Sequence, residues 1–159
     1  MTSSGERAAE LIGKSVGTTL GSGEWLEVDQ ERINGFADVT DDHQFIHVDP
    51  EACKEMSPWG VPIAHGFLTL SLLTKLVGSV PQDPAWLDGL AMGVNYGFDR
   101  VRFLSPVKVG SRIRASVEVK DVAQKDPNTV QVTQSVTVEI EDEAKPALVA
   151  DWVTRYVYG

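Results

Sequence analysis

The chain has 159 residues, a formal net charge of −9 and one cysteine. It is long enough for a core without disulfides, and its negative charge argues against a general binder of nucleic acid or of anionic membranes. The N-terminus does not have the composition of a signal peptide, and the most apolar window, residues 61–80, does not have that of a membrane span. We therefore expect a single cytoplasmic domain over residues 1–159.

The first half of the chain has the patterns of helices and loops. Residues 24–29 favour a short strand. A helix is predicted directly after it, because Asp29 is a preferred N-cap residue and precedes a helical apolar stripe. A second helix is predicted over residues 49–56, where Asp49 precedes a proline at the first helical position. The cysteine, Cys53, lies within the apolar stripe of this helix, which indicates core packing.

Residues 66–80, GFLTLSLLTKLVGSV, differ from the preceding helices. Leucine, valine and phenylalanine occupy most of the circumference, and this predicts one continuous helix that is buried on nearly every side. Its small polar residues, Thr69, Ser71 and Thr74, can bond their own backbone when buried.

The second half of the chain alternates between apolar and polar residues. At least four strands are predicted, over residues 90–104, 112–122, 130–140 and 147–159. The connections between them are short, which predicts an antiparallel meander. One buried helix and one long antiparallel sheet together predict an α+β fold in which the sheet wraps around the helix.

All three histidines, His43, His47 and His65, fall within one quarter of the sequence. Asp42 and His47 flank a turn-rich stretch, so their side chains are able to converge across a loop. A carboxylate and an imidazole that share one water form a general acid–base pair, each worth roughly 10²–10⁴-fold in rate. This spacing alone is not a specific motif.

Gly66 opens the predicted buried helix, where backbone N–H groups have no partner within the helix. A glycine there lets a ligand approach the backbone closely, and a carbonyl oxygen bound to that amide would be polarised. An acid–base pair with an oxyanion donor is suited to adding or removing water beside an activated carbonyl. His65, directly before Gly66, fits a structural role at the helix entrance as well as a functional one.

The same residues give weaker support to two other functions. A metal could be bound by the three histidines with Asp41 or Asp49, but no HExxH or paired-cysteine spacing supports a metal site. A serine hydrolase would need a G-x-S-x-G motif, which the chain lacks. Four arginines, at positions 100, 102, 112 and 114, either hold an anionic group or belong to solvated strand faces.

Residues 36–73, FADVTDDHQFIHVDPEACKEMSPWGVPIAHGFLTLSLL, closely resemble the MaoC-like motif of (R)-specific enoyl-CoA hydratases. The form D-x-Q-x-I-H is most similar to the NodN-like subgroup. Residues 95–113 resemble the strand pair that follows in this family, and the resemblance covers about residues 20–157. Gln44 and Phe45 replace the asparagine and proline that are usual in the family, which changes the loop and its amide contact with substrate.

The resemblance implies a hot-dog fold, with an antiparallel sheet of five or six strands around a long buried central helix. It implies a homodimer with sheets joined edge to edge. It also implies catalysis by Asp42 and His47, with the Gly66 amide as the oxyanion donor and with no metal or redox cofactor.

We therefore expect reversible hydration of a trans-2-enoyl thioester, of coenzyme A or an acyl carrier, to the (R)-3-hydroxyacyl thioester. The expected substrate contacts are Gln44, His65, Leu70, Thr74, Val77, Arg100 and Arg102. The arginines would meet coenzyme A phosphates, and the acyl chain would follow the helix. A hot-dog thioesterase and a non-catalytic binder or heterodimer partner are the alternatives.

Overall fold

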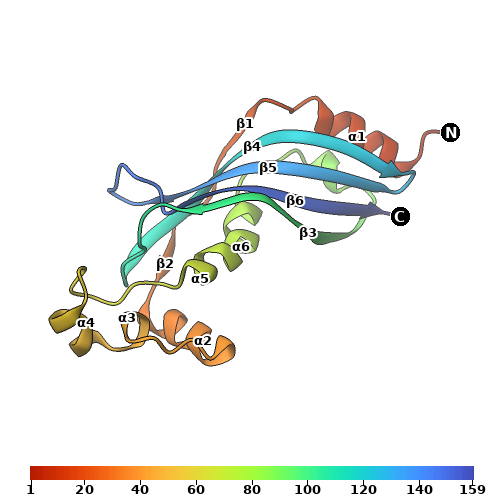
Figure 1. Ribbon diagram of the computed structural model, residues 1–159. Helices are drawn as coiled ribbons and strands as arrows, with labels where there is room; N and C mark the ends of the chain where they lie inside the picture. The colour runs from red at the N-terminus through yellow and green to blue at the C-terminus, as the bar shows by residue number, and fades with distance from the viewer.

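The computed structural model describes residues 1–159 and contains one antiparallel sheet of six strands, with helices packed on one of its faces (Figure 1). The strand order is β1-β4-β5-β6-β3, and β2 also pairs with β4. The strands are β1 (Thr19–Ser22), β2 (Leu26–Val28), β3 (Leu90–Phe103), β4 (Ser111–Asp126), β5 (Thr129–Ile140) and β6 (Leu148–Tyr158).

The helices fall into three groups. Helices α5 and α6 lie beneath the sheet, α1 lies near its far end, and α2, α3 and α4 form a segment that projects away from it (Figure 1). None of the helices is long and apolar enough to cross a membrane. Their bounds are α1 (Ser4–Gly13), α2 (Gln30–Thr40), α3 (Phe45–Val48), α4 (Pro50–Met56), α5 (Gly66–Ser71), α6 (Leu73–Gly78) and the short 3₁₀ helix η1 (Pro84–Leu87).

The local predictions in the projecting segment are confirmed. The Asp29 side chain caps α2 by accepting a hydrogen bond from the backbone N–H of Arg32. Asp49 caps α4 in the same way, with Pro50 at the first helical position. Cys53 is fully buried, and burial raises the pKa of its thiol. Short polar side chains cap both helices through hydrogen bonds with nearby backbone N–H groups. Because these contacts are local, the sequence alone was sufficient to predict the two helices.

The predicted meander is wrong at one strand. Strand β3 pairs with β6 instead of β4, so it forms the opposite edge of the sheet. The connection over residues 104–110 crosses to the other side, where backbone N–H groups of Ala64 and Val109 bond to the carbonyls of Val107 and Pro62 at 2.7 and 2.9 Å. These bonds with the segment before α5 satisfy backbone N–H and carbonyl groups of the connection. Strands β3 and β4 therefore do not need a tight hairpin between them.

The predicted single helix over residues 66–80 is also corrected. The chain forms two short helices, α5 and α6, that meet at Leu72. Leu68, Leu73 and Leu76 are buried, whereas Phe67 is 66% exposed. One sheet covers only one side of the helix pair, so an apolar residue on the other side has no protein surface above it within one chain.

The core consists of two separate apolar clusters. The larger cluster, of 19 buried residues, joins α5 and α6 to the sheet. The smaller one, of 7 buried residues, joins α1 and η1 to the far end of the same face. The helix α1 was not predicted, although Ser3 and Glu6 form a capping box at its start.

Candidate active site

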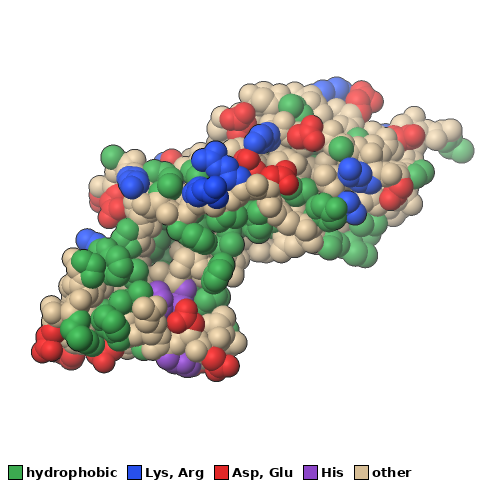
Figure 2. Space-filling model, in the orientation of Figure 1, with side chains coloured by type: hydrophobic (Ala, Val, Ile, Leu, Met, Phe, Trp, Pro, Cys, Tyr) green, Lys and Arg blue, Asp and Glu red, His purple; other side chains and the backbone are tan.

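Three side chains from the projecting segment and its connection to α5 meet beside the start of α5. One potential ligand atom from each of Asp42, His47 and His65 lies within 4.8 Å of the others. Asp42 is exposed, whereas His47 and His65 are only 6% and 2% exposed. Histidine side chains line a hollow between the projecting segment and the sheet, next to acidic side chains (Figure 2).

The backbone places Asp42 and His47 on the same side of a tight turn. Helix α2 ends at Thr40, and the next residue, Asp41, has a left-handed conformation with φ of 60°. The chain then reverses, and an Asp42 carboxylate oxygen accepts a long hydrogen bond of 3.4 Å from the backbone N–H of Gln44. Gln44 precedes α3, and one turn of that helix turns His47 into the interior. Gln44 itself is exposed.

His47 is held as a neutral imidazole with a defined tautomer. Its Nδ1 lies 2.7 Å from the backbone carbonyl of Ile63, and because a carbonyl only accepts, Nδ1 must carry the proton. Burial lowers the pKa of His47 below its usual value of 6.5, and the neighbouring His65 lowers it further, against the Ile63 bond and Asp42. The unprotonated Nε2 is therefore the atom able to take a proton.

His65 connects the two parts of the site. Its ring stacks on that of His47 with centroids 3.8 Å apart, and the Phe36 ring lies on it at 4.9 Å. Its Nε2–H donates to the backbone carbonyl of Asp42 at 3.0 Å. His65 thus holds the Asp42 backbone against the start of α5, while its buried Nδ1 has no hydrogen-bond partner.

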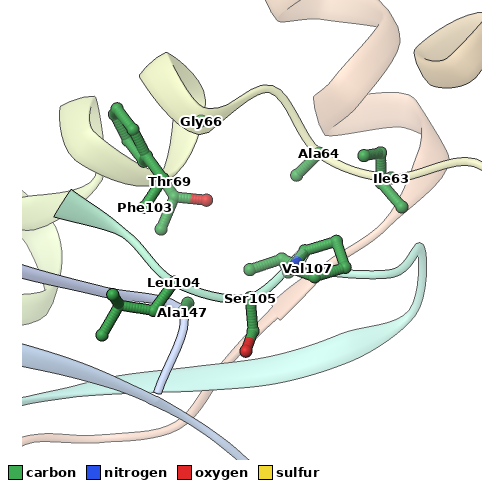
Figure 3. Close-up of a pocket in the computed structure, with 10 residues that line it drawn as sticks. Ile63, Ala64, Gly66, Thr69, Phe103, Leu104, Ser105, Val107 and Ala147 are labelled. Atoms are coloured by element: carbon green, nitrogen blue, oxygen red, sulfur yellow. The ribbon is translucent and has the colours of Figure 1, made fainter. Parts of the chain in front are cut away.

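Gly66 is the first residue of α5, so its N–H has no partner within the helix. A β-carbon at this position would lie 3.0 Å from the Phe103 ring. Gly66, Thr69 and Phe103 line a cavity of about 240 Å³ with residues of the crossing connection (Figure 3). A side chain at Gly66 would therefore narrow the cavity at the amide.

Of the metal ligands considered from the sequence, only His47 and His65 lie close together. His43 lies on the exposed side, where its Nε2 contacts an Asp38 carboxylate oxygen at 2.8 Å, and Asp49 caps α4. His47 and His65 stack nearly parallel, with an interplanar angle of 23°. Because imidazole lone pairs lie in the ring plane, two stacked rings cannot both direct a lone pair at one ion. The cluster is better suited to proton transfer than to tetrahedral metal binding.

The remaining predicted substrate contacts lie farther from this cluster. Leu70 packs against the larger apolar cluster, and Thr74 and Val77 line a second pocket farther along α6. Arg100 and Arg102 are exposed on β3 and form no ion pair. Sequence reasoning did not identify Ile63 or Phe103, because their contacts depend on where distant segments cross.

An antiparallel sheet packed on the central helix pair α5 and α6 is the architecture of a hot-dog fold. A family model described as "MaoC like domain" matches residues 12–141. The (R)-hydratase from A. caviae involved in PHA biosynthesis has a similar structure, with a TM-score of 0.68, 24% identity and coverage of 87% of this chain and 94% of that chain. The chain therefore has a hot-dog α+β fold and belongs to the MaoC-like family.

Two curated relatives are similar over most of their length. Nodulation protein N of Rhizobium leguminosarum bv. viciae is 49% identical over 140 residues, which cover 87% of this chain and 84% of the relative. The 3-hydroxyacyl-thioester dehydratase Z of Mycobacterium tuberculosis is 45% identical over 152 residues, which cover 96% of this chain and 97% of the relative.

Proposed function

We propose that this protein is a hydro-lyase that reversibly adds water to a trans-2-enoyl thioester and forms the (R)-3-hydroxyacyl thioester. The observation that carries the proposal is the neutral His47, with Nε2 unprotonated, beside the Asp42 carboxylate and the free Gly66 amide. The dehydratase name of one relative and the resemblance of residues 36–73 to the (R)-specific motif support the same reaction.

In the hydration direction, the Gly66 N–H donates to the thioester carbonyl oxygen and draws electron density away from C3. Asp42 and His47 Nε2 hold one water. His47 Nε2 takes a proton as the water oxygen bonds to C3, and the C2–C3 π electrons move to the enolate that Gly66 stabilises. The proton on His47 Nε2 is then transferred to C2 as the carbonyl re-forms, so the elements of one water are added without oxidation or reduction.

The direct experiment is hydration of crotonyl-CoA by the purified chain. We expect the enoyl absorbance to fall, with the (R)-3-hydroxy product identified by chiral analysis. Release of free coenzyme A thiol without loss of the enoyl group would mean that the protein is a thioesterase. Binding of the thioester with neither reaction would point to a non-catalytic binder.

We also propose that two copies pair along β3. This strand pairs only with β6, so its other edge is open, and an open edge invites another strand. Exposed apolar side chains gather on the same strand, namely Met92, Val94, Tyr96, Phe98 and Phe103, and Figure 2 shows apolar side chains along this part of the sheet. A two-fold dimer would cover them.

Sedimentation at micromolar concentration tests this assembly. We expect the wild-type chain to sediment as a dimer, and the double variant Met92→Lys with Val94→Lys to shift toward the monomer. Val39→Lys, at an exposed valine on α2, is the matched control that should leave the dimer intact. A wild-type chain that sediments only as a monomer would refute the proposal.

A further inference from the structure

The cavity beside Gly66 contains a buried hydroxyl group that has no role in the reaction described above. Thr69 lines this cavity together with Gly66 and Phe103, and most of the other lining residues are apolar. Thr69 is only 3% exposed. A hydroxyl in such surroundings usually has a hydrogen-bond partner, because one that leaves water without a partner is destabilising. The hydrogen bonds of Thr69 are therefore informative about what the cavity binds.

The Thr69 hydroxyl forms no hydrogen bond within the chain. Ser71, on the same helix, donates its hydroxyl to the backbone carbonyl of Phe67, four residues earlier, at 2.7 Å. The equivalent carbonyl for Thr69 is that of His65, and it accepts instead from the backbone N–H groups of Leu68 and Thr69 at 3.1 and 3.2 Å. The hydroxyl of Thr69 is therefore left free for a ligand.

This hydroxyl is also accessible from the cavity. Two side-chain atoms of the chain, His65 Nδ1 and Thr154 Oγ1, are unpaired and enclosed on all sides, and Thr69 Oγ1 is not one of them. The unpaired oxygen of Thr69 must therefore keep some exposed surface. Figure 3 shows this oxygen directed from α5 into the space below Gly66. The Thr69 hydroxyl is thus an open polar group of the cavity wall.

Thr69 and Gly66 lie on the same face of α5. They are three residues apart, and residues with this spacing are neighbours on a helix surface. A helical side chain also leans toward the N-terminus, over the turn that precedes its own α-carbon. The Thr69 side chain therefore lies over the turn that begins at Gly66. Because Gly66 has no side chain, the space beside its backbone stays open to a ligand.

Ser105 provides the other hydroxyl group among the lining residues. It lies across the cavity from α5, in the connection between β3 and β4, and Figure 3 shows its oxygen directed away from Gly66. No charged side chain lines the cavity. The Gly66 N–H and the Thr69 hydroxyl are therefore a pair of hydrogen-bond donors on one side of an otherwise weakly polar space.

We propose that the Thr69 hydroxyl donates a second hydrogen bond to the thioester carbonyl oxygen that Gly66 binds. The inference rests on the proposed function and adds a catalytic residue to it. A carbonyl oxygen has two lone pairs, so it can accept from the Gly66 N–H and from Thr69 together. Negative charge develops on this oxygen as water adds to C3, so both bonds strengthen toward the enolate. Thr69 keeps its proton throughout.

Replacing the hydroxyl by a methyl group tests this role. Thr69→Val keeps the shape of the side chain and removes the donor. We expect kcat for crotonyl-CoA hydration to fall about 10²-fold, the lower end of the loss found when one oxyanion donor is removed. The value of kcat/KM should fall by the same factor, because the bond is strongest in the transition state. A wild-type kcat in Thr69→Val, or a rise in KM alone, would overturn the inference.

Two further variants control for packing. Thr69→Ser keeps the hydroxyl and should retain most of the activity. Thr133→Val makes the same change at another buried threonine, on β5, which lines neither the cavity nor the second pocket, and it should leave kcat unchanged. Denaturant titrations compare the stability of the variants. An equal loss of kcat in Thr69→Ser and Thr69→Val would mean that Thr69 acts through packing, and this would overturn the inference.

The carbonyl stretch of a bound thioester gives a readout that does not depend on turnover. Butyryl-CoA, isotopically labelled at the carbonyl carbon, cannot be hydrated, and each hydrogen bond to its carbonyl oxygen weakens the C=O bond. Difference infrared spectra should show a smaller downshift of this band in Thr69→Val than in the wild-type protein or in Thr69→Ser. If Thr69→Val does not fold, Thr69→Ala also removes the donor and takes its place. Equal bands with and without the hydroxyl would overturn the inference.

The two measurements separate the inference from the proposed function. Normal hydration, with no effect of Thr69→Val on kcat or on the carbonyl band, would refute only the role of Thr69. No hydration by the wild-type protein, together with a carbonyl band that depends on the Thr69 hydroxyl, would refute the hydratase and leave the carbonyl-binding site standing.

Discussion

The candidate active site and the second pocket are built in different ways. The candidate site takes Asp42, His47 and Gly66 from one stretch of 25 residues, held by short loops and caps. The second pocket, at the distal end of α6, takes Thr74, Asn95 and Thr154 from α6, β3 and β6. The residues of the candidate site are therefore encoded locally, whereas the lining of the second pocket depends on which strands become neighbours.

The largest expected effect comes from the acid–base pair. Asp42→Asn and His47→Ala should each lower kcat by roughly 10²–10⁴-fold, the scale of a lost general acid or base. If both residues hold one water, as proposed, the double variant should lose little more than either single one. Steady-state hydration of crotonyl-CoA measures this.

The same segment offers a matched control. Asp38 and His43 form an exposed pair of the same residue types that points away from the site. Asp38→Asn and His43→Ala should leave kcat within about twofold, since exposed pairs contribute little. Losses that multiply in the Asp42 and His47 double variant would contradict a shared water.

The next effect concerns the close approach to the backbone at Gly66. Gly66→Ala keeps the N–H but places a β-carbon 3.0 Å from the Phe103 ring, which narrows the cavity. We expect kcat/KM to fall by about tenfold, less than the roughly 10²–10³-fold loss found when an oxyanion donor is removed, because the N–H is kept. Gly35→Ala is the control, because Gly35 also lies in a helix and its β-carbon would contact nothing. Full activity of Gly66→Ala would mean that the substrate does not use the open space beside the Gly66 backbone.

A smaller effect is expected at the distal end. Val77→Trp should fill the pocket beside α6 and lower kcat/KM for dodecenoyl-CoA about tenfold relative to crotonyl-CoA, or about 1.4 kcal/mol. The comparison of the two substrates separates a blocked path from general damage to packing. Equal losses on both would mean that the acyl chain does not follow the helix.

The smallest expected effect is the dependence of stability and activity on pH through His47. The pKa of His47 is lowered in the folded protein, so the folded state binds fewer protons than the unfolded state between that pKa and 6.5. The free energy of unfolding should therefore fall as the pH drops from 7 through 6.5 toward the lowered pKa. Denaturant titrations should show that the free energy of unfolding of His47→Gln depends less on pH.

The activity should also depend on the protonation of His47. The acidic limb of kcat/KM should bend below pH 6.5, because Nε2 must be unprotonated to take a proton.

Several features were predictable because their causes are local. Asp29 and Asp49 cap their helices through neighbouring N–H groups, and the alternation in β4, β5 and β6 follows from one face being buried. The grouping of Asp42 and His47 in one turn-rich segment likewise predicted that their side chains converge, and the structure places their polar atoms within 4.8 Å of each other.

Tertiary structure alone decided the rest. Nothing local to β3 specifies pairing with β6, and nothing in residues 66–80 specifies which of their apolar side chains the sheet leaves uncovered. The tautomer of His47 is set by the carbonyl of Ile63, and the unpaired hydroxyl of Thr154 arises only where α6 meets the sheet. Hydrogen bonds, burial and pKa shifts depend on atoms within a few ångströms. Many of those atoms belong to residues that are distant in the sequence, so only the tertiary structure determines which ones are neighbours.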